Sequence, residues 1–221
     1  MRGPTFLLAL LALVGSASAQ PSATQAPESF RSIELRGGGS VTVRHGPERR
    51  VTVLGDNPGR PIRTDGDRIV INHCAGHCPR GHRIAVEIVT PELSRLAVAD
   101  GGRIELSGEF PPQRAVAASV SSGGTIDLRP LEAAQVAAAV EHGGRILARP
   151  GRSLAATVSH GGNVTYWGEA SVTSSIRHGG VVERGDPDEL RRPVAQLDQR
   201  LAPPPVPAIV PPAQVRPVRK P

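Results

Sequence analysis

The stretch VEHGGRILARPGRSLAATVSHGGNVTYWG (140–168) contains two copies of one short pattern. In each copy a Val is followed, after one residue, by His-Gly-Gly, and one residue later by Ile or Val. Leu154, Ala156 and Val158 alternate with small or polar residues on the way into the second copy. Alternation with a period of two, bounded by Gly or Pro, is typical of β-strands. The stretch therefore predicts strand, tight turn and strand, repeated.

The same pattern occurs five times along the chain. Its glycine pairs begin at positions 101, 123, 143, 161 and 179, so the spacing is 18 to 22 residues. Helical repeats are longer, at roughly 33–47 residues, whereas strand-turn-strand units of this length suit the coils of a β-solenoid. Strands of successive coils would lie about 4.8 Å apart in a parallel ladder. One inward column is expected from equivalent positions: Val98, Val120, Val140, Val158 and Ile176.

The first half of the chain is less regular. Short alternating segments within 30–46, 49–56, 66–72 and 82–93 predict five further strands. A stack of repeats needs its open end covered, so we expect these strands to form the N-terminal coils or a cap.

Both ends of the chain have a distinct composition. Arg2, the apolar run 6–14 and the small residues Ala17-Ser18-Ala19 are typical of a signal peptide, here residues 1–19. The apolar run is too short to span a bilayer, and no transmembrane segment is expected. We divide the rest into a linker (20–29), a β domain (30–185) and a Pro-rich, basic, mostly disordered tail (186–221) with room for a short helix near 187–201.

Most of the formal net charge of +6 lies in residues 191–221 of that tail. Against the single acidic residue Asp198, residues 191–221 contain the basic residues Arg191, Arg192, Arg200, Arg216, Arg219 and Lys220. A nucleic-acid-binding domain would have its basic patch on the fold, so that class is excluded. The tail is instead predicted to contact an anionic polysaccharide or lipid head groups of the cell envelope, through contacts that salt screens.

Three segments together resemble a known family. They are SIELRGGGSVTVRHG (32–46), IAVEIVTPELSRLAVADGGRIELSG (84–108) and the repeated glycine turn before Ile or Val. In this order they resemble the head GIN domain family of autotransporter adhesins, found in exported bacterial proteins, from about Phe30 to Gly185. The resemblance implies a right-handed parallel β-helix and a role at the cell surface. The family usually has Gly-Ser-Gly-like turns, whereas this chain has Gly-Gly, three times preceded by His.

Those three histidines, His142, His160 and His178, would occupy one corner on successive coils. Two interpretations follow from the spacing. Imidazoles about 4.8 Å apart can stack as a surface ladder. They could also tilt towards a shared metal ion. Zinc, however, needs each nitrogen within about 2.1 Å of the ion, and three coils in line span too great a distance for all three rings to reach one ion. The spacing favours the structural ladder.

A second cluster lies in NHCAGHCPRGH (72–82). In an exported protein its two cysteines, Cys74 and Cys78, are expected to form a disulfide. Alternatives are inert thiols, or a zinc or copper site. The ligands of that site would be His73, Cys74, His77, Cys78 and His82.

The sequence contains no Gly-x-Ser-x-Gly nucleophile motif, and its acidic side chains are scattered over the coils. We therefore predict an exported, non-enzymatic module of the periplasm or cell surface that binds other molecules and has no cofactor. A metal-binding envelope protein using residues 73–82 is the main alternative, and a polysaccharide-active enzyme is a further one. Of the adjacent aromatic residues Tyr166 and Trp167, only one can face outward, and we expect it to be Trp167. The oligomeric state and the identity of the partner are not predicted.

Overall fold

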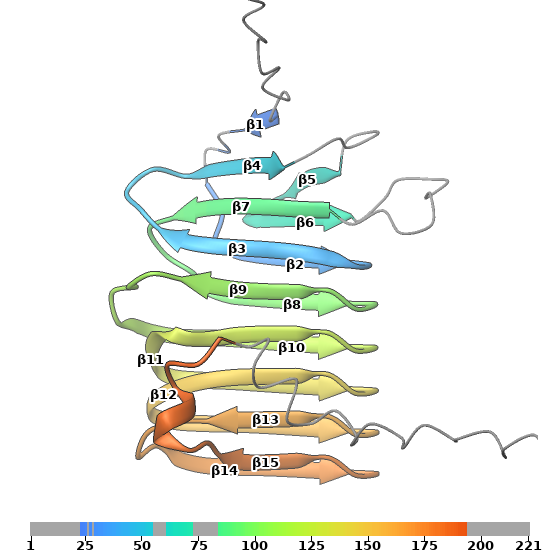
Figure 1. Ribbon diagram of the computed structural model, residues 1–221, viewed down its shortest axis with the longest axis vertical. Helices are drawn as coiled ribbons and strands as arrows, with labels where there is room; N and C mark the ends of the chain where they lie inside the picture. The colour runs from blue at the N-terminus through green and yellow to red at the C-terminus, as the bar shows by residue number, and fades with distance from the viewer. Residues whose placement is uncertain (1–22, 26, 28, 55–60, 73–83, 194–221) are drawn as a thin grey trace, which may run out of the picture.

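The computed structural model describes residues 23–25, 27, 29–54, 61–72 and 84–193 (Figure 1). This part of the chain is all-β, and its only helix is the short 3₁₀ turn η1 (Pro187–Glu189). No helix in it is long and apolar enough to cross a membrane. The strands are β1 (Ala23–Gln25), β2 (Ser32–Arg36), β3 (Gly39–His45), β4 (Arg50–Leu54), β5 (Ile62–Asp65), β6 (Arg68–Asn72), β7 (Ile84–Thr90), β8 (Arg95–Ala99), β9 (Arg103–Ser107), β10 (Gln113–Ser121), β11 (Thr125–Glu141), β12 (Arg145–Ser159), β13 (Asn163–Tyr166), β14 (Ser171–Arg177) and β15 (Val181–Arg184).

All fifteen strands belong to one sheet that folds over on itself. One side, which we call ladder A, follows the order β5-β6-β2-β8-β10, then 133–141 of β11, 153–159 of β12, and β14. The other side, ladder B, follows β1-β4-β7-β3-β9, then the first residues of β11 and β12, then β13 and β15. The long strands β11 and β12 therefore connect the two sides, and the core lies between them.

A three-residue turn at one edge leads from ladder A to ladder B in each regular unit. In the turn at 142–144 all three residues have positive φ: 51° at His142, 83° at Gly143 and 104° at Gly144. Position 143 requires glycine only because of its positive φ, since a Cβ there would meet nothing within 4 Å. At Gly144 a Cβ would lie 2.5 Å from Val120 Cγ1 and 3.0 Å from the Gly124 oxygen of the preceding unit. The second glycine of the turn is therefore required because any side chain there would clash with the unit stacked before it.

The predicted inward column is present. Val98, Val120, Val140, Val158 and Ile176 follow one another in parallel register along ladder A. The four valines are buried, but Ile176 is 46% exposed. Ile176 continues the inward column but is exposed, because β14 pairs only with β12 among the described strands and nothing described covers its other edge.

The N-terminal strands do not stack in chain order. β2 pairs with both β6 and β8, and β3 pairs with both β7 and β9, so the first unit of the chain lies between two later ones. Antiparallel strands cover that end: β4 on β7, β1 on β4 and β5 on β6. The predicted linker 20–29 thus contains the sheet strand β1. The sheet is therefore mixed, with parallel and antiparallel pairs. The predicted all-β fold class is confirmed.

Candidate functional site

Over β10, β11, β12 and β14, the outer surface of ladder A consists mostly of small side chains. Burial alternates along its strands, so the residues between the buried valines and alanines point outward. We call the outward positions of β10, β11, β12 and β14 on this side the small-residue face. They are Ala115, Ala117, Ser119, Ser121, Gln135, Ala137, Ala139, Glu141, Ser153, Ala155, Thr157, Ser159, Ser171, Thr173, Ser175 and Arg177. The only charges among them, Glu141 and Arg177, lie beside the glycine turns.

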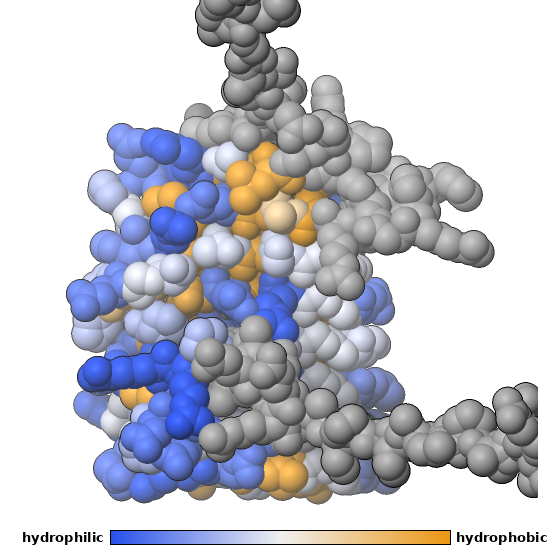
Figure 2. Space-filling model, viewed as in Figure 1, coloured by the Kyte–Doolittle hydropathy of each residue, from blue (hydrophilic) through white to orange (hydrophobic). Residues whose placement is uncertain are grey.

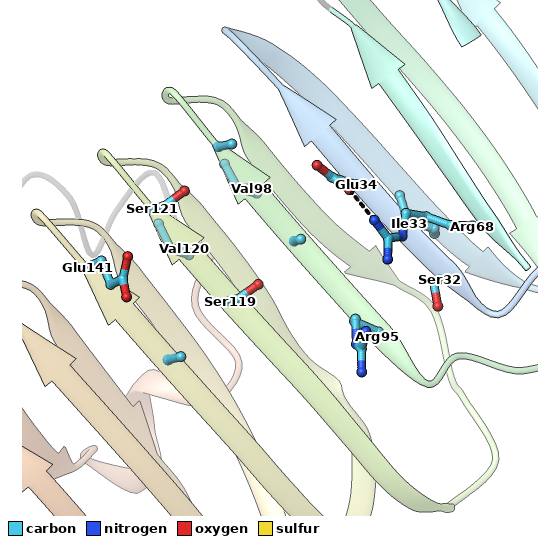
Figure 3. A pocket seen from close by; sticks show the side chains of 13 residues that line it. Ser32, Ile33, Glu34, Arg68, Arg95, Val98, Ser119, Val120, Ser121 and Glu141 are labelled. Carbon is cyan, nitrogen blue, oxygen red and sulfur yellow. Dashed lines mark hydrogen bonds and ion pairs between the residues drawn. The ribbon is translucent and has the colours of Figure 1, made fainter. Parts of the chain in front are cut away.

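Two shallow hollows lie on ladder A's outer surface. One, of about 570 Å³, is lined by small residues of β10, β11, β12 and β14, among them Ala117, Ala137 and Ala155. The other, of about 390 Å³, extends the surface towards β8 and β2 and includes Ser119 and Glu141 (Figure 3). The surface is thus open to a partner over several neighbouring strands.

Charged side chains border the second hollow. Glu34 pairs with Arg36 at 2.6 Å and with Arg68 at 3.1 Å, and the hydrogen bond from Arg36 to Glu34 raises the pKa of the guanidinium. Arg95 of β8 points to the same side (Figure 3) and has no ion-pair partner among the described residues. The hydroxyl and methyl groups beside these charges offer hydrogen bonds and close approach to a flat ligand.

The outer surface of ladder B is different in kind. Figure 2 shows many hydrophilic residues on it, with hydrophobic patches over the upper strands. Its charged side chains form ion pairs with one another, such as Arg44–Glu87 at 3.1 Å and Arg103–Glu105 at 3.0 Å. Arg129 and Asp127 form a buried bidentate pair, with N–O distances of 2.9 and 2.7 Å.

Residues 186–193, which we call the C-terminal segment, cover part of ladder B (Figure 1). The Arg129 guanidinium donates to the carbonyl oxygens of Glu189 at 2.8 Å and Arg192 at 2.7 Å. Leu190 packs on the small cluster of Leu147 and Trp167. The folded part therefore continues past the predicted boundary at Gly185, and the predicted helix near 187–201 is represented in the described chain by η1 alone.

Trp167 belongs to this contact, and our expectation for it is wrong in part. It does lie on the outer side of ladder B, but it is only 4% exposed. Its indole N–H donates to the Asp186 carbonyl at 2.8 Å, and its ring lies 5.7 Å from the Arg129 guanidinium carbon. An aromatic platform for a ligand is therefore not available at this residue.

The three turn histidines form the stacked column that their spacing predicts. The ring centroids of His142 and His160 are 4.8 Å apart, and those of His160 and His178 are 4.7 Å apart, with planes 7° and 11° from parallel. Asp100 and Ser122 occupy the same turn position in earlier units, also with positive φ. Positive φ at the residue before each glycine pair was not predicted from the sequence, although Asp and His are enriched in that conformation.

The remaining predicted site residues lie mostly outside the described chain. His73, Cys74, His77, Cys78 and His82 all fall in the undescribed range 73–83, so neither the disulfide nor the metal site is tested. Elsewhere, within the described ranges, no group of three or more His, Cys, Asp or Glu side chains could hold a metal. In the basic tail, Arg191 is exposed and Arg192 contributes its carbonyl to Arg129, while Arg200, Arg216, Arg219 and Lys220 lie beyond residue 193.

The small-residue face was missed by the sequence analysis, although a signal for it was present. In AVAASVS (115–121), QVAAAVE (135–141) and SLAATVS (153–159) the positions between the predicted inward residues are almost all Ala, Ser or Thr. Solvent-facing strand positions normally include many long charged side chains, so this composition distinguishes one face.

Comparison with known proteins gives one family match. Residues 79–170 match the family model described as "Putative auto-transporter adhesin, head GIN domain". No curated protein matches the chain.

Solved structures give similar but remote matches. A "putative adhesin" from Bacteroides fragilis is 14% identical with a TM-score of 0.48, and the alignment covers 75% of this chain and 97% of that one. A "putative cell adhesion protein" from Clostridium sporogenes is 8% identical with a TM-score of 0.31, covering 74% and 98%. A "Putative lipid binding protein" from Parabacteroides distasonis is 12% identical with a TM-score of 0.31, covering 75% and 96%.

The matched segment begins shortly before β7 and ends between β13 and β14, so it includes most of the small-residue face. Over residues 79–170, the resemblance to the head GIN domain family that the sequence predicted is confirmed.

Proposed function

We propose that the protein is an exported, non-catalytic module of the cell envelope or cell surface, similar in role to an adhesin, and that it binds a macromolecule across the small-residue face. The observation that supports this is the composition of that face. Its outward side chains on β10, β11, β12 and β14 are short and nearly uncharged, whereas the opposite outer surface is charged and partly covered by the chain itself.

Physical chemistry favours binding at such a surface. Short Ala, Ser and Thr side chains lose little rotamer entropy when a partner covers them. Strands about 4.8 Å apart present their methyl and hydroxyl groups in regular rows, so an extended or flat partner can contact many at once. We also propose that the parallel units form the right-handed β-helix that the family resemblance implies, which the parallel registers of β8 to β15 support.

The basic tail supplies a second and different contact. Its cationic residues, of which Arg191 is exposed on the described chain, would hold the protein near an anionic polysaccharide or lipid head groups. This attraction depends on charge and falls with added salt. Binding at the small-residue face has little net charge to screen.

These two contributions separate in a sedimentation assay with isolated cell-envelope material. The full exported chain is compared with a variant ending at Pro193, each at low salt and at about 1 M salt, where the Debye length is about 3 Å. We expect the shortened protein to keep binding that salt does not remove, and the full chain to bind more at low salt only. If the shortened protein does not bind at all, the small-residue face is not a binding site.

The alternative of an envelope metal protein stays a prediction from the five potential ligands between His73 and His82. Metal analysis of the purified protein tests it. Stoichiometric zinc or copper, lost in a Cys74→Ser/Cys78→Ser variant, would support it, whereas metal-free protein with a Cys74–Cys78 disulfide would support the structural interpretation.

A further inference from the structure

The two ends of the stack are closed to different degrees. At the β14–β15 end, each strand pairs on one edge only among the described strands. The chain here exposes 37% of Val172, 46% of Ile176 and 45% of Val181. Among the described residues only one other large hydrophobic side chain, Leu54, is comparably exposed. Apolar atoms are visible at this lower end of the molecule in Figure 2.

The opposite end lacks such a surface. Antiparallel strands cover it, and β5 has the exposed polar residues Arg63, Thr64 and Asp65. Short, charged, antiparallel edges prevent further pairing of strands. β14, with seven residues, no Pro and only Arg177 charged, has none of these protections. Among the described residues nothing pairs with the outer edge of β14, so its backbone groups and apolar side chains there form an open sheet edge.

We infer that this edge pairs with the same edge of a second copy of the chain. The inward residues of β14 are Val172, Ser174 and Ile176, a set that is symmetric about Ser174. In antiparallel self-pairing about Ser174, Val172 lies opposite the partner's Ile176, and Ser174 lies opposite the partner's Ser174. Each apolar side chain therefore lies opposite an apolar side chain, and the two small Ser174 side chains lie opposite each other. Matched cross-strand pairs of this kind stabilise a sheet.

A two-fold pairing of this kind closes on itself. Because the β5 end is protected, the association cannot continue head to tail into a fibre, and the product is a dimer. A two-fold axis perpendicular to the sheets places both small-residue faces on the same side, in one continuous surface. If the proposed function holds, the dimer offers a partner two binding surfaces at once, which raises avidity without any new contact.

Sedimentation-velocity ultracentrifugation of the full exported chain tests the dimer without any ligand. We expect a dimer at micromolar concentration, and a monomer of half that mass for Ile176→Asp, which places a charge at the paired edge. Leu54→Asp, an equally exposed apolar position at the other end, is the matched control and should remain a dimer. A monomeric wild type, or a dimer that Ile176→Asp does not change, would overturn the inference.

A cross-linking experiment tests the register and does not depend on the stability of Ile176→Asp. Directly opposite residues in antiparallel strands have Cα atoms about 4.5–5.5 Å apart, which a disulfide can bridge. Ser174→Cys should therefore form a dimer linked through residue 174, identified by peptide mass mapping, and Ser119→Cys on the outer surface should not. If the wild type is monomeric and dimerises only when residues 194–221 are removed, the tail covers this edge and the inference is wrong.

Discussion

The outer surfaces of ladder A and ladder B belong to the same sheet, and the strands β11 and β12 contribute to both, yet the two surfaces differ in almost every property. On the small-residue face of ladder A the outward residues are short and nearly uncharged. On ladder B they include Asp127, Arg129 and Trp167, which the C-terminal segment covers. The inward residues of both sides are alike, aliphatic and buried. The fold therefore constrains the inward positions to buried aliphatic residues. The outward positions differ between the two ladders, in line with the different contacts that each surface makes.

The largest expected effect concerns this difference between inward and outward positions. Val140→Asp places an unpaired carboxylate at a fully buried point of ladder A, and we expect a loss of more than about 4 kcal/mol in unfolding free energy, enough to prevent folding. Ala137→Asp, on the same strand but exposed, should change stability by less than about 0.5 kcal/mol. Circular dichroism and thermal melts measure both. Equal effects would contradict the assignment of the two faces.

The next effect is expected on ladder B. Arg129→Ala leaves the buried Asp127 carboxylate without its bidentate partner, and we expect a cost of about 3–5 kcal/mol. Arg149→Ala, which removes an exposed pair with Glu132, is the control and should cost about 0–1 kcal/mol. Denaturant unfolding gives both values. A small effect at Arg129 would mean that ladder B's covered surface does not stabilise the fold.

A truncation series should define the C-terminal segment. A chain ending at Gly185 exposes Trp167 and removes two acceptors from Arg129, so we expect a loss on the order of 2 kcal/mol. Trp167 is the only tryptophan, and its fluorescence should shift to longer wavelength. A chain ending at Pro193 should keep the emission and melting temperature of the full chain. Identical emission from both truncated chains would show that the segment does not cover Trp167.

The smallest effect is expected at the turn that joins the two ladders. His160 has a φ of 56°, a conformation that Asn tolerates and a β-branched residue does not. We expect His160→Val to cost about 1–2 kcal/mol and His160→Asn less than about 0.5 kcal/mol. Thermal melts distinguish the two variants, and equal melting temperatures would show that the backbone of this turn imposes no constraint.

The regular half of this fold could be predicted because its signals are local and repeated. The alternation before each glycine pair defines which residues face inward, and the equal spacing aligns Val120, Val140 and Val158. The order of β2 and β3 could not be predicted. Their patterns match those of several strands equally well, and nothing local shows that this unit lies between β6–β7 and β8–β9.

The contact of the C-terminal segment was hidden for a different reason. Arg129 and Arg192 are of a residue type that is normally exposed, and the segment is short, polar and contains Pro. Only the three-dimensional contact between Arg129 and two carbonyl oxygens shows that it packs on the sheet. The small-residue face, by contrast, could have been found from the residues at alternate positions of β10, β11 and β12.

The most direct measurement of the central claim compares two charge-matched double variants for binding to cell-envelope material. Ala137→Arg/Ala155→Arg places two bulky side chains on the small-residue face, and Thr42→Arg/Thr125→Arg places two on the outer surface of ladder B. Both variants gain the same charge, and thermal melts check that both fold. We predict that the dissociation constant rises at least about tenfold, or about 1.4 kcal/mol, only for the ladder A variant. Equal binding by the two variants would contradict the claim that the small-residue face is the binding surface.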